Sequence, residues 1–538
     1  MKYLLLYVVG VSSTMLSAVV MPTMSLRLRG PHTATVEQWE KTRQAISENP
    51  GCCDEVWFST GIGVPPLAWH REQAARLGKA ADDLRKLGIV PSLQFQATLG
   101  HSDALSACED CSAKTWTGWT GSTGVEDKYC NCPRQPAFLA YVREMARAYA
   151  AFKPGSVWID DDLRIGNHTP ATKGSERGCW CETCIADFNA DMKASWTRPT
   201  LAVAIAKDDV LKEKWLEFSI RSICEVACAI AEEFRHHSPE TRMALQHTFA
   251  TEAIPSVRAL RDALYQASGK PVGLRPGGGF YYDINPGDQI VKAMATARSR
   301  KALECPYVDV WCPEVESWPR AYGSRSGQSA ILESFMSIAY GCNSTSLLLL
   351  DTRYERDDLY SRTILKPLAD AAPVLKGYIR ANEGTVPAGY GADGLSAARL
   401  YRWALCGIPV LPGVGKNLGN LSDVDLKLDI CMQGSQTVQE ARLAHDAPAV
   451  LESPFVGLLV PRTTASGALK TVALLNTRID AQGPVVVRVK GVSAKTVTWH
   501  PLRRPSCILD VRSTSGVSRV TIPEIASWNA GYLSFEAE

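Results

Sequence analysis

Short apolar runs, many of them rich in β-branched residues, alternate with longer segments of helical period from about residue 24 to about residue 380. This alternation is typical of a parallel sheet with crossover helices. Eight apolar runs qualify as strands: Met24–Arg29, Asp54–Ser59, Val90–Phe95, Ser156–Asp160, Arg242–His247, Pro271–Arg275, Val308–Cys312 and Thr345–Asp351. Eight strands, each followed by a helix, predict an α/β protein with a (β/α)8 TIM barrel over residues 22–380, whose chemistry lies on the loops after the strand ends.

Start and stop signals of helices occur where this architecture requires them. Thr35 with Gln38 predicts a capping box, and Pro136 suits a first helical turn. Glycines such as Gly88 and Gly269 follow helical runs and predict helix ends. The caps therefore agree with the strand count.

The pattern changes after the last predicted barrel helix. A glycine-rich stretch opens residues 381–447, which we predict to form a small α/β domain. Residues 448–538 contain only short strands separated by turn residues: Phe455–Val460, Thr471–Leu475, Val485–Val489, Thr496–Trp499, Ile508–Val511, Arg519–Ile522 and Tyr532–Phe535. Seven short strands of this kind predict a C-terminal β-sandwich.

The N-terminus carries a candidate targeting segment. Lys2 leads into an apolar run that ends near Ala18, which predicts a signal peptide over residues 1–18 and a secreted or periplasmic protein. The alternative is a buried first strand, because the positive region is a single lysine. No other apolar run reaches the roughly 20 residues of a membrane span, so we expect no membrane partner for the mature form.

Charge and cysteine content exclude further classes. The 58 Lys and Arg residues balance 56 Asp and Glu residues, which argues against a nucleic-acid partner. The 17 cysteines are an odd number, so a general disulfide framework is not expected. Seven of them form a local group in two short regions: Cys108, Cys111, Cys130, Cys132, Cys179, Cys181 and Cys184. Four others lie in apolar surroundings and are expected to be buried thiols: Cys224, Cys228, Cys342 and Cys406.

Two acidic segments follow predicted strand ends. The fourth strand closes with Asp160, Asp161 and Asp162, and the seventh is followed by Glu314 and Glu316. Adjacent carboxylates repel each other, which raises the pKa of at least one of them and suits a general acid. Strands four and seven face each other across a barrel mouth, so these carboxylates can flank one glycosidic bond. The alternatives are a metal site or an ion-pair cluster for the aspartates, and exposed rim residues for the glutamates.

Further polar and aromatic residues near the same strand ends are candidates for sugar binding: Arg164 and His168 after the aspartates, His247 and Arg275 at the ends of strands five and six, and Trp318 beside Glu316. An exposed indole is a natural stacking surface for a pyranose ring. Each residue also has a structural interpretation, as an ion-pair partner, an ordinary loop residue or a core aromatic.

The segment that starts at Asp160 resembles the β-galactosidases of glycoside hydrolase family 42, in the clan A of TIM-barrel glycosidases. In that family an apolar strand ends in Asp-Asn-Glu and is followed by Cys-x-Cys-x-x-Cys and an aromatic residue. Here Asp160-Asp161-Asp162 is followed by Cys179-Trp180-Cys181-Glu182-Thr183-Cys184 and then Phe188. The resemblance implies a glycoside or oligosaccharide substrate. It also makes a homo-oligomer a further expectation, although the segment 381–447 is much shorter than the family's trimerisation domain.

The resemblance also implies a structural zinc ion and no catalytic cofactor. In the family the three cysteines join a fourth, from the loop after strand three, and Cys132 matches that position. Four thiolates at the spacings of Cys132, Cys179, Cys181 and Cys184 form a closed tetrahedral site. Three cysteines are additional and form either a second metal site or, after export, a disulfide: Cys108, Cys111 and Cys130.

Roles carried over by the resemblance make Asp162 the acid/base and place Asp161 where the family has the asparagine that contacts the sugar 2-hydroxyl, with Asp160 in a supporting, sugar-binding role. Glu316 takes the nucleophile position because Glu316-Ser317-Trp318-Pro319 resembles the family's Glu-x-x-Pro, and Glu314 is its rival. Aspartate in place of glutamate shortens the acid by one methylene, which would widen the carboxylate separation and favour inversion.

We therefore expect a retaining β-glycosidase of β-galactosidase-like character. Two hypotheses stay open beside it: an inverting glycosidase that uses the same carboxylates, and a non-catalytic carbohydrate-binding barrel. A third hypothesis is metal-assisted hydrolysis at the three aspartates with His168, which predicts a loss of activity on mild chelation.

Overall fold

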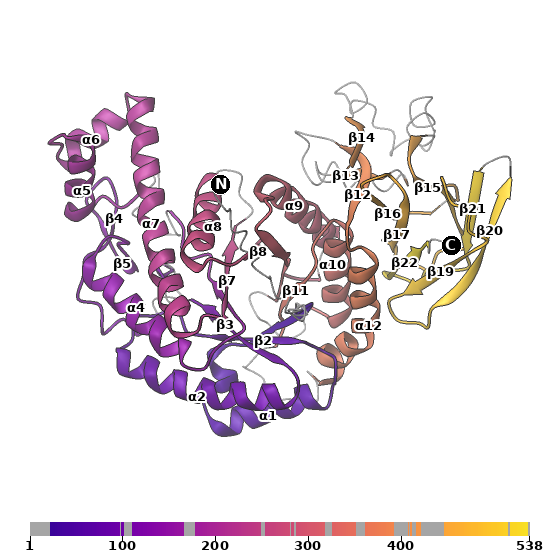
Figure 1. Cartoon of the computed structure of the whole chain (residues 1–538), viewed down its shortest axis with the longest axis horizontal. Helices are drawn as coiled ribbons and strands as arrows, with labels where there is room; N and C mark the ends of the chain where they lie inside the picture. The colour runs from indigo at the N-terminus through magenta and orange to yellow at the C-terminus, as the bar shows by residue number, and fades with distance from the viewer. Residues whose placement is uncertain are drawn as a thin grey trace, which may run out of the picture.

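The fold was analysed in a computed structural model, which describes residues 22–96, 98–101, 110–165, 178–248, 253–279, 281–283, 287–317, 325–350, 361–391, 407, 409–411, 416–420, 446–453, 455–514 and 517–535 (Figure 1). Several predictions fall outside these ranges: the signal peptide and the placements of His168, Trp318, Cys108 and Cys406. None of the helices in the described ranges combines the length and the apolar character that a membrane crossing requires.

A nine-stranded parallel sheet forms the wall of the barrel. Its order is β10-β11-β1-β2-β3-β6-β7-β8-β9. The strands are β1 (Met24–Arg27), β2 (Glu55–Ser59), β3 (Val90–Phe95), β6 (Ser156–Ile159), β7 (Arg242–His247), β8 (Val272–Pro276), β9 (Val308–Trp311), β10 (Glu314–Glu316) and β11 (Thr345–Leu348). Every one of the eight predicted strands is present, so the predicted TIM barrel is confirmed.

The ninth strand results from a break in the seventh. β9 and β10 follow each other directly along the chain, and Pro313 lies between them. Proline has no N–H group to give to a ladder, so it interrupts a strand. β9 pairs with β8 and β10 pairs with β11, and the two halves together close the barrel.

Helices cover the outside of the barrel (Figure 1). They are α1 (Val36–Ser47), α2 (Leu67–Lys86), α4 (Pro136–Ala150), α7 (Asp209–His237), α8 (Ile254–Ser268), α9 (Gly287–Leu303), α10 (Gly327–Ala339) and α12 (Lys366–Ala381). The Thr35 side chain caps α1 by accepting from the Gln38 N–H, and Gly269 ends α8 in the left-handed conformation at φ 70°. Thr35 and Gly269 thus act at the predicted helix ends.

An extension stands out from one side of the barrel, at the left of Figure 1. It consists of the hairpin of β4 (Gly118–Thr120) and β5 (Glu126–Asn131), the helices α5 (Glu182–Met192) and α6 (Arg198–Ile205), and the first half of the long helix α7. The hairpin follows the third barrel strand and α5 follows the fourth. Residues of the loops after these two strands therefore meet in the extension.

Two tryptophans and a buried carboxylate fill the part of the barrel interior that lies below the mouth, toward the N-terminal ends of the strands. Trp57 and Trp158 stack with ring centroids 4.3 Å apart. The Glu55 carboxylate, 4% exposed, accepts hydrogen bonds from four neighbours: the hydroxyls of Ser25, Ser92 and Ser156, and Nε1 of Trp57. Because its acceptors are satisfied, this charged group can be held in the interior. The polar residues of the barrel mouth lie above this filled layer.

The C-terminal part of the chain forms an eleven-stranded, mostly antiparallel sheet, at the right of Figure 1. Its strands are β12 (Thr385–Gly391), β13 (Val410–Leu411), β14 (Lys416–Asn420), β15 (Ala449–Leu451), β16 (Gly457–Thr464), β17 (Leu469–Asn476), β18 (Val485–Val489), β19 (Thr496–Pro501), β20 (Cys507–Thr514), β21 (Val517–Ile522) and β22 (Ala530–Ser534). The seven strands predicted for residues 448–538 are all present, and the sheet fits the predicted β-sandwich. β12 belongs to the segment predicted as a small α/β domain, and it pairs with β16 of this same sheet.

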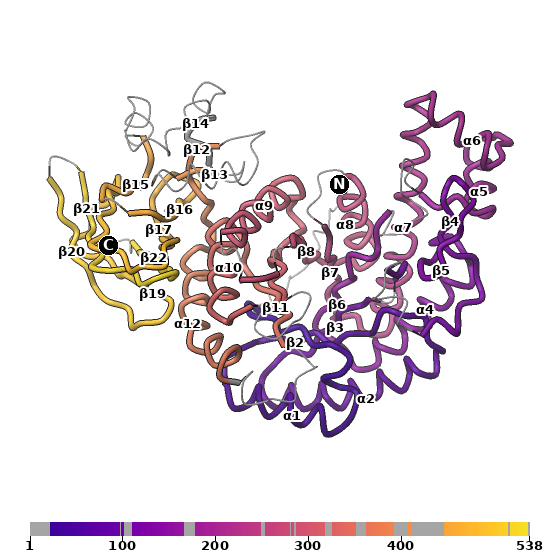
Figure 2. The backbone as a smooth tube through the Cα atoms, turned by 180° about the vertical axis from the view of Figure 1, so that it is seen from behind, coloured from indigo at the N-terminus to yellow at the C-terminus, as the bar shows by residue number. Residues whose placement is uncertain are grey.

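The barrel and the C-terminal sheet share one apolar core. The view from behind in Figure 2 shows α12 between them. Tyr378 of α12 stacks on Tyr532 of β22 with ring centroids 4.6 Å apart. The buried guanidinium of Arg462, on β16, donates to the backbone carbonyls of Ile338 and Ala339 near the end of α10, at 3.4 and 3.0 Å. An arginine of the sheet thus binds the helix that follows the seventh barrel strand.

Candidate active site

A cavity of about 860 Å³ opens at the mouth of the barrel, where the C-terminal strand ends converge. Seven of the predicted site residues line it together: Asp160, Asp161, Asp162, Arg164, Arg275, Glu314 and Glu316. They come from the segment after β6 and from β8 and β10. The structure therefore brings the acidic residues of the fourth and seventh strands to one cavity.

Asp160 is the centre of a hydrogen-bonded network at this mouth. Its Oδ2 accepts from the side-chain amide of Gln94 at 2.6 Å and from that of Gln246 at 3.3 Å. Gln94 is on β3 and Gln246 on β7, the two strands that flank β6. Asp160 is 7% exposed, and both amides hold it as an acceptor inside the barrel. This position suits the supporting role expected for Asp160.

Each glutamine also accepts a hydrogen bond from an arginine, and that arginine pairs with a glutamate of β10. Oε1 of Gln94 accepts from Nε of Arg27 at 3.2 Å, and Nη1 of Arg27 is 3.1 Å from Oε2 of Glu316. On the other side, Oε1 of Gln246 accepts from Nε and Nη2 of Arg275 at 3.0 and 2.6 Å, and Arg275 pairs with Glu314. The two arms start at Asp160 and end on the two glutamates of β10.

The two glutamates have opposite electrostatic environments. Burial acts to raise the pKa of Glu314, but the charges of Arg275, Lys292 and Arg27 outweigh burial and lower this pKa to about 2. Glu314 also accepts from the Gly278 N–H and the Tyr281 hydroxyl, both at 3.1 Å. Glu314 is therefore ionised and fully engaged as a hydrogen-bond acceptor.

Glu316 is less strongly stabilised as an anion. Burial is the largest influence and raises its pKa, Arg27 opposes this rise, and the neighbouring charge of Glu314 adds to it. Paired carboxyls whose pKa values are pushed apart in this way are typical of sites that assign different roles to two acids. The environments favour Glu314 as a fixed anchor and Glu316 as the reactive carboxylate.

The other two aspartates of this segment, Asp161 and Asp162, differ in exposure and in their neighbours. The Asp161 side chain is 24% exposed and lies 3.7 Å from Nη1 of Arg164. Its charge adds to the influences that raise the pKa values of Arg275 and Tyr281. Asp162 is 2% exposed. Burial is the main cause that raises the pKa of the nearby Cys130 thiol, and the charges of Asp127 and Asp162 add to it. Both line the cavity, and Asp162 is the more deeply buried of the two.

His247 closes β7 in the wall beside the mouth. Its Nδ1 is 2.8 Å from the Thr248 carbonyl, so this nitrogen carries the proton and Nε2 is a bare acceptor. Burial lowers the pKa of His247 to about 4, so the ring is neutral at physiological pH. Its candidate role is therefore that of a neutral hydrogen-bond acceptor.

Sequence reasoning missed Arg27, Gln94 and Gln246, although they connect the candidate carboxylates. Each is a polar residue at or near the C-terminal end of a buried barrel strand. The sequence signal that could have identified them is a polar residue at the end of a parallel strand, because inward-facing residues at the strand ends of a barrel meet at its mouth.

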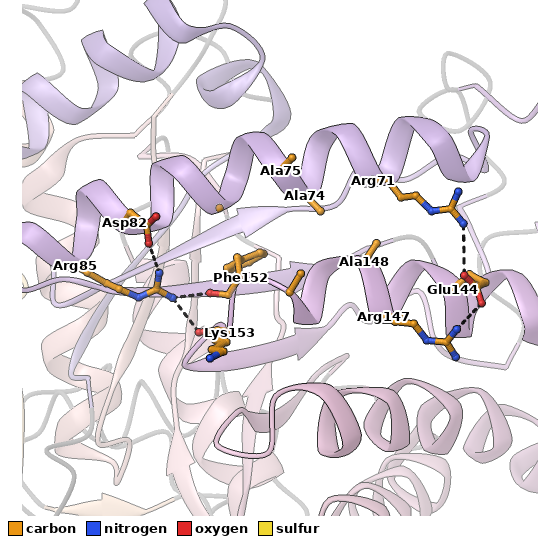
Figure 3. A pocket seen from close by; sticks show the side chains of 12 residues that line it. Arg71, Ala74, Ala75, Asp82, Arg85, Glu144, Arg147, Ala148, Phe152 and Lys153 are labelled. Carbon is orange, nitrogen blue, oxygen red and sulfur yellow. Dashed lines mark hydrogen bonds and ion pairs between the residues drawn. The ribbon is translucent and has the colours of Figure 1, made fainter.

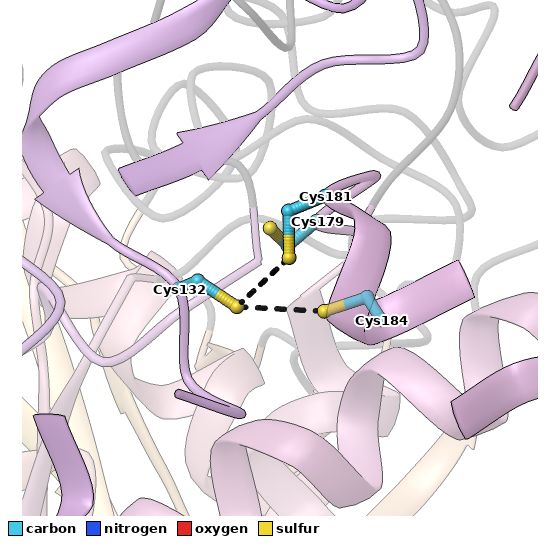
Figure 4. A group of neighbouring side chains, drawn as sticks. All are labelled: Cys132, Cys179, Cys181 and Cys184. Carbon is cyan, nitrogen blue, oxygen red and sulfur yellow. Dashed lines mark hydrogen bonds between the residues drawn. The ribbon is translucent and has the colours of Figure 1, made fainter. Parts of the chain in front are cut away.

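Four of the predicted cysteines meet in the extension beside the barrel. The Sγ atoms of Cys132, Cys179, Cys181 and Cys184 all lie within 4.8 Å of one another and are buried (Figure 4). Cys132 comes from the loop after β5, and the other three precede or begin α5. The Cys132 Sγ lies 3.5 Å from the Sγ atoms of both Cys181 and Cys184.

This donor set fits a tetrahedral zinc ion. Zn–S bonds of about 2.3 Å separate the sulfur atoms of a tetrahedron by about 3.8 Å, close to the distances observed. The Thr120 N–H points at Cys179 Sγ at 3.4 Å, and the Gln135 amide at Cys181 Sγ at 3.8 Å. Such outer donors stabilise thiolate ligands.

No disulfide joins the remaining described cysteines to one another. Cys130 donates to the Gly100 carbonyl at 3.5 Å, and Cys111 is half-buried. Cys342 is buried as predicted, whereas Cys224 and Cys228 are only partly buried.

A second cavity, of about 740 Å³, lies on the outside of the barrel between α2 and α4 (Figure 3). Five of its charged residues are in ion pairs: Arg71 and Arg147 bind Glu144, and Arg85 binds Asp82. It is remote from the strand ends and contains none of the predicted site residues. The barrel mouth is therefore the candidate active site.

The fold is similar to the folds of several solved glycoside hydrolases. Gan42B, a family 42 β-galactosidase from G. stearothermophilus, is similar with a TM-score of 0.57 and 10% identity over 96% of this chain and 98% of that chain. The α-L-fucosidase isoenzyme 2 from Paenibacillus thiaminolyticus gives a TM-score of 0.54 and 11% identity, over 96% and 100%. A cold-adapted β-galactosidase from Rahnella sp. R3 gives 0.53 and 12%, over 95% and 99%.

No protein-family model matches the sequence, and neither does any protein of curated function. At 10 to 12% identity the solved structures establish the fold. The resemblance to family 42 seen in the sequence is therefore confirmed for the fold.

Proposed function

We propose that this chain is a glycoside hydrolase that cleaves O-glycosidic bonds in the barrel mouth. The observation that carries the proposal is that carboxylates from the fourth and seventh strands line one cavity and are connected through the hydrogen-bonded network centred on Asp160. The cavity of about 860 Å³ has the size of a small-molecule site. A pair of carboxylic acids across a sugar ring is what glycosidic cleavage requires.

Glu316 is the nucleophile in this proposal. Its Oε attacks the anomeric carbon while the bond to the leaving oxygen breaks, and a glycosyl ester forms. Arg27 holds the carboxylate in place at 3.1 Å. Glu314 is less suited to attack because Arg275, Gly278 and Tyr281 all donate to it. Its role is to keep Arg275 and the β8 side of the mouth in position.

Asp162 is the acid/base in this proposal, and Asp161 contacts the sugar. Asp162 gives its proton to the leaving oxygen, then takes a proton from the water that breaks the glycosyl ester. Asp162 is 2% exposed and lines the same cavity as Glu316. Asp161, with 24% of its side chain exposed, is the comparison residue.

The test combines turnover with covalent trapping. The wild-type chain is incubated with a panel of activated aryl glycosides and with their 2-deoxy-2-fluoro analogues, and peptide mass spectrometry locates the adduct. We expect turnover, an adduct on Glu316, and a loss of about 10³-fold or more in kcat for Glu316→Gln. Asp162→Asn should spare substrates with good leaving groups and recover with azide, whereas Asp161→Asn should not show this pattern.

Other outcomes identify the alternatives. An adduct on Glu314 exchanges the two glutamates, and azide rescue of Asp161→Asn instead of Asp162→Asn exchanges the two aspartates. An inverted first product in NMR excludes the nucleophile and supports inversion. Sugar binding without turnover of any substrate supports a carbohydrate-binding barrel. Loss of activity on mild chelation supports metal-assisted hydrolysis.

We also propose that the four clustered thiolates bind one structural zinc ion. The fit of the sulfur positions and the two outer N–H donors support this proposal. The ion would join the loop after β5 to the start of α5, and thereby two of the segments that follow barrel strands. Its contribution to the site is to fix these loops.

A further inference from the structure

A buried cluster of three charged side chains adjoins the two glutamates of β10. It consists of Lys292 on α9, Glu333 on α10, and Arg325, which directly precedes Ser326, the N-cap residue of α10. These three side chains are 1%, 0% and 0% exposed. The Glu333 carboxylate binds both cations, because its Oε1 lies 3.2 Å from the Lys292 Nζ and its Oε2 pairs with Nη2 of Arg325. Within the described ranges, no other carboxylate lies within ion-pair distance of either cation.

Arg325 binds the main chain of the proposed nucleophile. Its Nη1 donates to the backbone carbonyl of Glu316 at 2.9 Å, and Glu316 is the last residue of β10. Its Nη2 donates to the Glu333 carboxylate. A planar guanidinium that is bound through both terminal nitrogens has a fixed orientation. Glu333 therefore holds the backbone of Glu316 through Arg325.

Lys292 contacts the two groups that donate to the other glutamate of β10. Its Nζ lies 5.2 Å from the centroid of the Tyr281 ring, and the Tyr281 hydroxyl donates to Oε2 of Glu314 at 3.1 Å. Its side chain also packs against Gly278, where an added Cβ would be 2.9 Å from the Lys292 Cγ. The Gly278 N–H donates to the same Oε2 at 3.1 Å. Lys292 therefore supports both donors from the side of α9.

Stability alone does not account for a charge cluster at this place. Replacing a buried ion pair by well-packed apolar residues is often neutral or stabilising, by about 1–4 kcal/mol. Lys292, Glu333 and Arg325 do not belong to the lining of the mouth cavity. They can act on a bound sugar only through β10 and the donors to Glu314. A role in orienting the two glutamates explains both their charge and their position.

We propose that Glu333 is a positioning residue for glycosidic cleavage, which holds Glu316 through Arg325 and the donors to Glu314 through Lys292. This inference rests on the proposed glycosidase function with Glu316 as the nucleophile. A displacement of about 1 Å that originates far from the chemistry can cost about 10²-fold in rate. Loss of the Glu333 charge should therefore reduce kcat, whereas KM, which depends on the residues that line the cavity, should change little.

The test is the steady-state kinetics of Glu333→Gln on an aryl glycoside that the wild-type chain hydrolyses. Glutamine keeps the shape of the side chain and removes the charge that holds both cations. We expect kcat to fall about 10²-fold and KM to stay within about threefold. The rate of covalent trapping by the 2-deoxy-2-fluoro analogue should fall by the same factor, because attack by Glu316 is the affected step. Glu333→Asp keeps the charge and should recover most of the lost kcat.

The matched control is Glu233→Gln. Glu233 is a buried glutamate of α7, and it lies between two cations of α4, at 3.6 Å from Arg143 and 3.2 Å from Arg147. This variant removes a comparable helix carboxylate that joins two outer helices, so kcat should stay within about twofold. Both variants are assayed at a temperature at which circular dichroism shows them folded. If Glu333→Gln does not fold, Arg325→Lys tests the same contact, because lysine keeps the charge but not the two-point binding, and kcat should fall with KM unchanged.

The outcomes separate this inference from the proposed function. Wild-type turnover with kcat unchanged in Glu333→Gln, or in Arg325→Lys, refutes the positioning role and leaves the glycosidase intact. Equal losses of kcat in Glu333→Gln and Glu233→Gln would show a general effect of lost stability and would also overturn the inference. No turnover by the wild-type chain on any glycoside refutes the proposed function, and the positioning role with it.

Discussion

Replacement of Glu314 by glutamine tests the electrostatic core of the barrel mouth. Glu314 and Arg275 form an ion pair whose side chains are 7% and 2% exposed. Glutamine keeps the shape of the side chain but removes the charge, and its NH2 group meets the donors that Glu314 accepts from. The variant therefore leaves a buried guanidinium without a counter-ion.

The size of the effect follows from the ionisation of Glu314. A pKa lowered from 4.5 to about 2 corresponds to about 3 kcal/mol in favour of the folded protein when Glu314 is ionised. Breaking a buried pair by removing one partner typically costs about 3–5 kcal/mol. We therefore expect Glu314→Gln to lower the free energy of unfolding of the barrel by about 3–5 kcal/mol at pH 7.

The pH dependence of the free energy of unfolding shows whether the charge of Glu314 is the cause of the effect. Because the folded-state pKa of Glu314 is lowered, its contribution is complete above about pH 4.5 and is lost as the pH falls toward 2. Urea unfolding of wild type and variant, followed by tryptophan fluorescence, should show a difference that is largest at neutral pH and shrinks below pH 4.5. The matched control is Glu304→Gln: the Glu304 side chain is 57% exposed, and its ion pair with Arg300 should be worth less than about 1 kcal/mol.

A difference between wild type and Glu314→Gln that is unchanged from pH 7 to pH 2.5 would refute this reasoning. It would mean that the loss comes from packing or from hydrogen bonds of the neutral group. An effect no larger than that of Glu304→Gln would show that Arg275 finds another counter-charge.

Three further predictions concern other parts of the fold. Cys184→Ser should reduce the zinc content measured by plasma mass spectrometry from about one ion per chain to near zero. The control variant Cys228→Ser should leave the zinc content unchanged. Zinc retained in Cys184→Ser would contradict the proposed zinc site. Trp57→Ala removes half of the stacked pair with Trp158 and should cost about 3–5 kcal/mol in urea unfolding, and an unchanged midpoint would contradict the packing. His247 should titrate near pH 4 in NMR, so its contribution to stability is full above about pH 6.5 and is lost as the pH falls to about 4; a midpoint near 6.5 would show that the ring is accessible.

The barrel could be predicted from the sequence because each strand carries its own local signal. Apolar, β-branched runs recur with helical segments between them, and the confirmed strand count follows from this pattern alone. The split of the seventh strand at Pro313 was not predicted, although the proline was visible in the sequence. The pairing of β9 and β10 with different neighbours depends on closure of the whole sheet, which no local pattern encodes.

The sequence predicted only those residues of the candidate site that stand out by their charge or by their spacing. Three successive aspartates and two glutamates stand out in apolar surroundings, and the structure brings them to one cavity. Gln94 and Gln246 gave no such signal, because an isolated amide in a strand is as compatible with structure as with function. Their importance arises from their neighbours across the sheet, so it became visible only once β3, β6 and β7 lay side by side.

The junction between the two parts of the chain determines how the molecule unfolds. Arg462 of the sheet holds the end of α10, and Tyr532 stacks on α12, so neither part can lose its structure without exposing the other. Heating should therefore give a single cooperative calorimetric transition. A chain cut after α12 would expose the apolar faces of α10 and α12 to water and aggregate. The C-terminal sheet thus serves as part of the folding unit that holds the seventh barrel strand and its glutamates in place.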